Sequence, residues 1–169
     1  MSEPHDAPPL DPRAEHLIRA LDLQPHPEGG YYREIFRSPH RVSPRDGRLD
    51  RSALTTIHFL LTRGQHSRWH RVASDEVWHF LAGDPLQLCW IEGEEQARVV
   101  TLGESELDGP FVEVVPAGCW QAARTMGAFS LVGCTVGPGF EFEDFRFVKA
   151  LPGHEEHFKD VLRAHEHLL

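Results

Sequence analysis

The segment from Ser67 to Gly83, SRWHRVASDEVWHFLAG, brings together several side chains that could do chemistry. His70 has an ordinary pKa close to neutrality, which suits a general base. Glu76 begins a strand-like run in which alternation puts Trp78 and Phe80 on the same face as the carboxyl. A carboxyl among aromatic rings is expected to have a raised pKa unless a cation or a metal meets it. The segment is therefore a candidate for a metal site, an acid/base site or a ligand-binding wall.

The elements that must position these residues are predicted to be short β-strands. Runs rich in β-branched and large apolar residues alternate with turns that contain glycine, proline or aspartate. The predicted strands cover residues 31–37, 52–62, 76–82, 86–92, 97–102, 111–115, 119–125, 128–136 and 140–148, and residues 37–51 are predicted to form a polar loop. This spacing is typical of a β-sandwich or a small barrel.

Helices are expected only at the two ends of the chain. Asp11 can cap a short helix whose first turn contains Pro12, and the apolar residues that follow lie at helical spacing. Residues 154–169 also place apolar side chains along one helical face. We therefore expect a disordered tail over residues 1–10 and a single domain over residues 11–169, all-β with short flanking N- and C-terminal helices.

Composition narrows the classes of partner. The chain has 169 residues, a formal charge of −9 and a pI of about 5.7. No basic run is present, which disfavours nucleic acid and anionic membrane surfaces. No apolar run reaches the roughly 18 residues of a membrane span. Three cysteines without paired spacing indicate buried free thiols in a reducing compartment, so a cytoplasmic location is expected.

The spacing of the central segment resembles a known motif. Gly64, five residues, His70, one residue, Val72, three residues, Glu76, six residues and Gly83 follow the first motif of the cupin superfamily, with Val72 in place of its second histidine. The string PAGCWQAART approximates the second cupin motif, with Gln121 in place of its histidine and Thr125 in place of its asparagine.

Longer strings are similar to one branch of this superfamily, the largely uncharacterised fifth cupin family, whose fold resembles that of RmlC-type sugar epimerases. These strings are HPEGGYYRE (26–34), SDEVWHFLAGDPL (74–86) and GCTVGPGFEFEDF (133–145). The resemblance covers residues 17–147 and implies a double-stranded β-helix, the cupin jelly roll, with the ligand pocket inside the barrel. It also implies a homodimer, because cupins commonly pair through their outer strands.

The resemblance leaves the metal question open. A typical cupin metal (Fe, Mn, Zn or Ni) is held by three histidines and one glutamate. Here His70 and Glu76 keep two of these four positions and would be the ligands if a metal is bound. Val72 cannot ligate, and Gln121 is a weak neutral donor. No cofactor is certain, and a divalent metal stays one alternative.

Acid/base chemistry without a metal is a second alternative, by chemical analogy with epimerases. His70 would be the base, Asp75 or Glu76 would orient it, and Tyr31 or Tyr32 would be the acid, with Glu76 and Tyr32 preferred. Tyr31, Arg33, Trp78 and Gln121 are expected to bind the ligand, with Arg33 anchoring a carboxylate or phosphate.

The expected function is that of a cytoplasmic cupin that binds a small polar, carbohydrate-like molecule, with an isomerase- or epimerase-like activity. The alternatives are a metal-dependent dioxygenase or isomerase, and a ligand-binding or sensor protein without catalysis. More ordinary roles compete with these, since a single histidine is often a hydrogen-bonded interior residue. In the same way, Glu28 could belong to a surface ion pair of little consequence.

Overall fold

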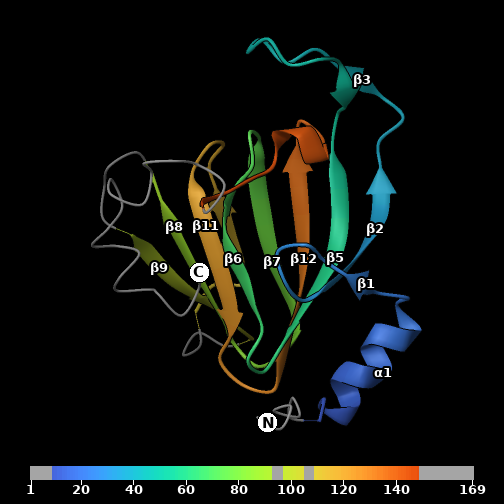
Figure 1. Ribbon diagram of the computed structural model, residues 1–169, viewed down its shortest axis with the longest axis vertical. Helices are drawn as coiled ribbons and strands as arrows, with labels where there is room; N and C mark the ends of the chain where they lie inside the picture. Colours follow the sequence, from blue (N-terminus) through green and yellow to red (C-terminus); the bar gives the residue numbers. More distant parts are fainter. Residues whose placement is uncertain (1–8, 93–96, 105–108, 149–169) are drawn as a thin grey trace, which may run out of the picture.

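Two antiparallel sheets face each other in the computed structural model, which describes residues 9–92, 97–104 and 109–148 (Figure 1). The six-stranded sheet has the order β1 (Gln24–Pro25), β2 (Tyr31–Arg37), β5 (Thr55–Thr62), β12 (Phe129–Gly137), β7 (Asp75–Gly83) and β10 (Val112–Val115). The five-stranded sheet has the order β13 (Arg146–Phe147), β6 (His66–Arg71), β11 (Trp120–Thr125), β8 (Leu86–Ile91) and β9 (Arg98–Leu102). This arrangement confirms the predicted all-β jelly roll.

Strand alternation buries one face of each sheet in the space between them. On β7, Glu76, Trp78 and Phe80 are buried, whereas Leu81 on the other face is 46% exposed. Trp78 and Phe80 belong to a core cluster with Phe59, which lies on β5. The face predicted from the sequence for this strand is confirmed, and it places the Glu76 carboxyl inside the molecule.

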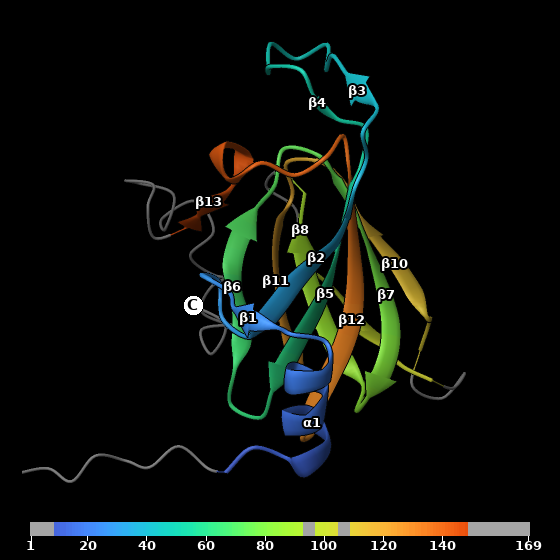
Figure 2. The ribbon, with the colours of Figure 1, turned by 90° about the vertical axis from the view of Figure 1, so that its right-hand side faces the viewer.

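Helix α1 (Pro12–Ala20) covers one end of the six-stranded sheet (Figure 2). The Asp11 side chain accepts hydrogen bonds from the backbone N–H groups of Arg13 (2.9 Å) and Ala14 (3.2 Å), as the predicted cap requires. Ala14 is fully buried in a cluster that includes Leu60 of β5. The second predicted helix, residues 154–169, and most of the predicted tail lie outside the described residues.

Several segments differ from the prediction. No strand is predicted between residues 62 and 76, where β6 (His66–Arg71) carries His70. The expected polar loop over residues 37–51 contains β3 (Arg41–Val42), which pairs with β4 (Arg51–Ser52). The expected strand over residues 140–148 is instead a 3₁₀ turn, η1 (Phe142–Asp144), followed by the short β13. The Phe145 N–H donates to the Phe142 carbonyl oxygen at 3.2 Å. This turn brings two rings that are three residues apart to the same side, which an extended strand would not do.

All three cysteines are free and buried, as expected. Of the helices in the described residues, none has the length and apolar character to cross a membrane.

Candidate functional site

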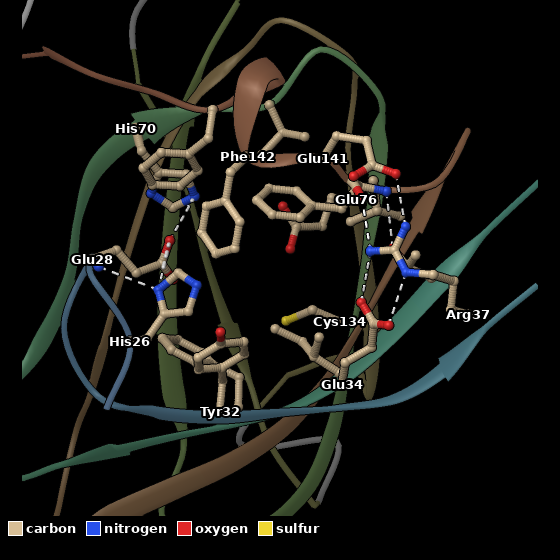
Figure 3. Close-up of a pocket in the computed structure, with 17 residues that line it drawn as sticks. His26, Glu28, Tyr32, Glu34, Arg37, His70, Glu76, Cys134, Glu141 and Phe142 are labelled. Atoms are coloured by element: carbon tan, nitrogen blue, oxygen red, sulfur yellow. Dashed lines mark hydrogen bonds and ion pairs between the residues drawn. The ribbon is translucent and has the colours of Figure 1, made fainter. Parts of the chain in front are cut away.

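A pocket with a cavity volume of about 140 Å³ opens between the two sheets, near η1 (Figure 3). His26, Glu28 and His70 lie on one side of it, and Glu34 and Arg37 lie on the other. Glu76 and Cys134, on neighbouring strands β7 and β12, lie between these two sides. The lining therefore draws on both sheets, the loop before β2 and the turn after β12.

A glutamine amide links the buried polar groups at the inner end of the pocket. The Trp78 indole N–H donates to Gln121 Oε1 at 3.1 Å. An indole nitrogen can only donate, so this bond fixes the orientation of the amide. Gln121 Nε2 then faces Glu76 Oε2 at 2.5 Å and His70 Nε2 at 3.2 Å. With one amide N–H directed at each, His70 Nε2 has to be an acceptor.

The second ring nitrogen of His70 agrees with this protonation state. His70 Nδ1 lies 2.7 Å from the Arg68 carbonyl oxygen, which only accepts, so Nδ1 carries the proton. Burial lowers the pKa of His70, although the nearby Glu76 carboxyl and the Arg68 carbonyl oppose that effect. His70 is thus a neutral imidazole whose Nε2 accepts the Gln121 N–H beside Glu28.

Glu28 is the third polar group of this cluster. Its Oε2 lies 3.3 Å from His70 Nε2, and its side chain is 8% exposed. Burial raises the pKa of Glu28 to about 8, while hydrogen bonding to Ser67 and the charge of Arg68 act in the opposite direction. In its protonated form Glu28 can donate to the same nitrogen that faces Gln121.

Glycines allow the loop before β2 to bring Glu28 this close. The Arg68 N–H donates to the Glu28 carbonyl oxygen at 3.0 Å, so the loop lies directly along β6. Gly29 has a φ of +113°, and a Cβ there would lie 2.2 Å from the His66 carbonyl oxygen. A side chain at this position would therefore push the loop, and Glu28 with it, away from His70.

Glu76 completes a cluster of two carboxyls and one imidazole. Burial raises the pKa of Glu76 to about 7, and the Glu28 charge adds to this rise. His70, Gln121 and Cys134 act in the opposite direction. Near neutral pH the cluster therefore holds groups that can give a proton and a group that can take one, which is the requirement for acid/base chemistry.

Aromatic rings form the wall beside this cluster. Phe145 stacks on His70, with ring centroids 4.9 Å apart and planes at 19°. Tyr32 meets the His26 ring edge-on at 4.5 Å, and Phe142 lies parallel to His26 at 6.4 Å. Burial, with His70 nearby, lowers the pKa of His26 to about 4, so this ring is neutral as well. A flat apolar part of a ligand can pack against this wall.

Ion pairs hold η1 over the pocket from two directions. Arg37 donates to Glu34 (2.9 and 2.8 Å), to Glu141 (2.8 Å) and to the Phe140 carbonyl oxygen (3.1 Å). On the other flank, Asp144 accepts from Arg51, which is 4% exposed. Residues distant in the sequence therefore fix the turn that carries Phe142 and Phe145.

The structure brings together only some of the residues predicted for the site. His70, Glu76 and Tyr32 line the pocket. Gln121 lies just behind them and contacts both His70 and Glu76. Trp78 is 1% exposed within the core, so it orients Gln121 instead of offering a surface to the ligand.

Tyr31 and Arg33 are not among the residues that line the pocket, contrary to the expected lining. Alternation along β2 turns Tyr32 and Glu34 inward, so their neighbours face outward. Tyr31 packs in the cluster beneath α1, and Arg33 donates to the Leu21 carbonyl oxygen at 3.1 Å. Arg33 therefore cannot anchor a carboxylate or phosphate inside the barrel in this arrangement.

Sequence reasoning missed Glu28, His26 and the Arg37 cluster. Glu28 is a buried partner of His70 and not part of a surface ion pair. The string HPEGG held a usable signal, because a glutamate followed by two glycines suits a close approach of backbone to a site. No comparable signal in the sequence joins Arg37 to Glu141.

The donors present do not fit the usual four-ligand metal site of cupins. Among the described residues, no group of three or more histidine, cysteine, aspartate or glutamate side chains is arranged to hold a metal ion. Val72 offers no donor atom, and the Gln121 oxygen is taken by Trp78 while its N–H groups face His70 and Glu76. An amide that presents hydrogens to the site cannot ligate a cation there.

Similar proteins are known. The family model described as "Cupin superfamily (DUF985)" matches residues 15–148. A hypothetical protein from Leishmania major is 37% identical, with a TM-score of 0.75 over 88% of this chain and 97% of its own. Protein SO0799 from Shewanella oneidensis is 35% identical, with a TM-score of 0.74 over 88% of this chain and 96% of its own. An uncharacterised protein of Saccharomyces cerevisiae, YML079W, is 28% identical over 80% of this chain and 75% of its own.

More distant structures share the fold alone. A Bacillus subtilis oxalate decarboxylase variant is 12% identical, with a TM-score of 0.56 over 83% of this chain and 35% of its own. The match of the family model to most of the chain, together with relatives above one third identity, decides the classification. The chain belongs to the cupin superfamily, in the family of unknown function described as DUF985.

Proposed function

We propose that the protein binds a small polar, carbohydrate-like molecule in the barrel pocket and moves a proton on it, as isomerases and epimerases do. The observation that carries this proposal is the contact of His70 Nε2 with Glu28 Oε2 (3.3 Å) and with the Gln121 amide that also holds Glu76. A base and two acids whose pKa values are close to neutral pH therefore meet at one end of a pocket that can hold a small molecule.

The roles follow from the protonation states. His70 takes a proton from a carbon next to a carbonyl group once the substrate displaces the Gln121 N–H from its Nε2, while its Nδ1–H stays held by the Arg68 carbonyl oxygen. Glu28 or Glu76, in the protonated form, returns a proton to the substrate. Tyr32 lines the same pocket and is a further candidate for the acid.

Exchange of substrate hydrogen with solvent deuterium tests this proposal whatever the product of the reaction is. The protein is incubated in D₂O with a panel of small aldoses, ketoses and hydroxyketones, and the loss of the proton next to the carbonyl is followed by ¹H NMR. We expect exchange with at least one compound, and its loss in His70→Ala and Glu28→Gln. Glu143→Gln, on η1 but outside the pocket lining, is the matched control and keeps the exchange.

Two outcomes would overturn the proposal. Exchange that survives His70→Ala at an unchanged rate would remove His70 from the chemistry. Saturable binding of a panel compound without any exchange would instead favour a binding or sensor role for the same pocket.

We also propose a cytoplasmic homodimer. The buried free thiols support a reducing compartment. The outward face of β7 and β10 supports self-association, since Leu81, Val112 and Val114 are each 44–46% exposed on it. Sedimentation at several concentrations measures the mass, and Val112→Lys is expected to shift it toward the monomer. A monomer at every concentration would contradict the homodimer.

A further inference from the structure

The pocket has an excess of acidic groups over basic ones. Four carboxyls line it, those of Glu28, Glu34, Glu76 and Glu141. Arg37 supplies the guanidinium of the lining, and four of its hydrogen bonds go to Glu34, Glu141 and a backbone carbonyl. A guanidinium has five N–H donors, so little capacity is left for an anionic ligand. Both histidines of the lining are neutral, because burial lowers the pKa of each.

Aromatic rings face the same space as the carboxyls. Tyr32, Phe59, Phe140, Phe142 and Phe145 all belong to the lining. The face of such a ring attracts a positive charge, and a desolvated carboxylate attracts it more strongly. Rings on one wall and buried carboxyls at the inner end form the usual surroundings of an organic ammonium group.

We propose that the ligand of this pocket is a small polar molecule that carries a protonated amine, held between the aromatic wall and the carboxyls of Glu28 and Glu76. The inference rests on the pocket of the proposed function and names its substrate class, for which an amino sugar is the carbohydrate-like form. It also excludes sugar phosphates and nucleotide-linked sugars, because their negative charge would meet Glu34, Glu76 and Glu141 without a free cation among the described lining residues.

Binding of such a cation should release protons. Burial keeps Glu76 and Glu28 partly protonated near neutral pH. An ammonium group between them favours their charged forms, so the protons leave as the amine binds. A neutral ligand of the same shape has no such effect. Proton release on binding therefore distinguishes an amine from a neutral ligand independently of affinity.

Three sugars of one skeleton test the inference: D-glucosamine, D-glucose and D-glucuronate. Each is titrated into the full-length protein at neutral pH by calorimetry, in two buffers that differ in ionisation enthalpy. We expect glucosamine to bind about tenfold more tightly than glucose, or better, since one desolvated ion pair contributes that much. We expect the carboxylate not to bind. Only the amine should show a heat that depends on the buffer, with the sign of proton release.

Substitutions locate the charge. Glu76→Gln should reduce the affinity for glucosamine about tenfold or more. The affinity for glucose should stay within about twofold of the wild-type value. Phe142 is 56% exposed, so it can be changed without disturbing the hydrophobic core. Phe142→Leu should weaken the binding of glucosamine roughly two- to tenfold. Glu143→Gln, outside the lining, is the matched control and should change neither.

The inference is overturned if glucose or glucuronate binds as tightly as glucosamine or more tightly. It is also overturned if glucosamine does not bind at millimolar concentration. Amine binding without proton release would also contradict it, because the buried carboxyls would then not be the partners. None of these results depends on turnover. Failure here therefore leaves the deuterium-exchange test intact, and failure of exchange leaves the charge preference intact.

Discussion

Raising the pH from about 6.5 to 8 should destabilise the folded protein, and Glu28→Gln should remove most of that loss. Burial holds the pKa of Glu28 at about 8, against an ordinary value of 4.5. Between these values the folded chain keeps a proton that the unfolded chain has released. The free energy of unfolding therefore falls as the pH rises, by about 1.4 kcal/mol per pH unit for one such group.

At lower pH the titration of His26 opposes this slope. Its pKa in the folded chain is about 4, against an ordinary 6.5, so it stays neutral while the unfolded chain takes up a proton. Stability contributed by His26 thus rises between pH 4 and 6.5, opposite to Glu28. Above pH 6.5 the Glu28 slope is the larger contribution, and for this group the interval up to pH 8 amounts to about 2 kcal/mol. Glu76, with a pKa of about 7, adds to the loss at the start of this interval.

Urea unfolding at a series of pH values measures this slope, with the free energy extrapolated to water at each pH. Wild type should lose at least about 2 kcal/mol over the interval, and Glu28→Gln should keep only the smaller loss that comes from Glu76, since an amide at position 28 does not titrate. Glu143→Gln, a change of the same type outside the pocket lining, should keep the wild-type slope. Wild-type stability that is constant or rises above pH 6.5 would refute the reasoning, as would an unchanged slope in Glu28→Gln.

Three further changes test other contacts. Trp78→Phe removes the N–H that fixes Gln121 and leaves a buried oxygen unpaired, so urea unfolding should show a loss of about 1–3 kcal/mol; an unchanged midpoint would contradict the role of Trp78. Gly29→Ala should destabilise more than Gly47→Ala, because both have positive φ but only a Cβ at Gly29 meets a backbone oxygen at 2.2 Å. The double change Val72→His with Gln121→His restores four donors, and metal analysis of the purified protein should then find stoichiometric divalent metal. Stoichiometric metal already present in the wild type would contradict the donor argument.

Local pattern was sufficient for the all-β class and for the face of β7, whereas the jelly roll followed from the resemblance and β6 was not predicted. Alternation on β7 correctly placed Glu76 inside the molecule, because one run of apolar residues determines the face. On β2 the pattern is ambiguous: Tyr31 and Tyr32 are the same residue type, so composition cannot say which of them faces inward. Pairing with β5 decides the phase, and that is a property of the assembled sheet.

Contacts between distant segments account for the rest. Glu28 reaches His70 through backbone angles that only the structure reveals, and the Arg37–Glu141 pair joins residues 104 positions apart. The ending FEFEDFRF (140–147) begins with the alternation of a strand, yet the spacing of its phenylalanines at 140, 142, 145 and 147 changes from two to three at the turn. The ion pairs of Glu141, just before η1, and of Asp144, within it, hold the turn in place.

Gln121 connects the missing metal ligands to the proposed chemistry. A metal ion among histidines would supply the positive charge that a buried glutamate needs. Here the same position offers a neutral amide, which donates one hydrogen to Glu76 and directs the other at His70. The charge of the buried carboxyls must then be limited by protons, which is why burial raises the pKa of both Glu28 and Glu76. A cluster that is neutralised by protons can exchange them with a substrate, and it can also lose them to an arriving cation. The same substitution therefore underlies both the proton transfer and the preference for an amine.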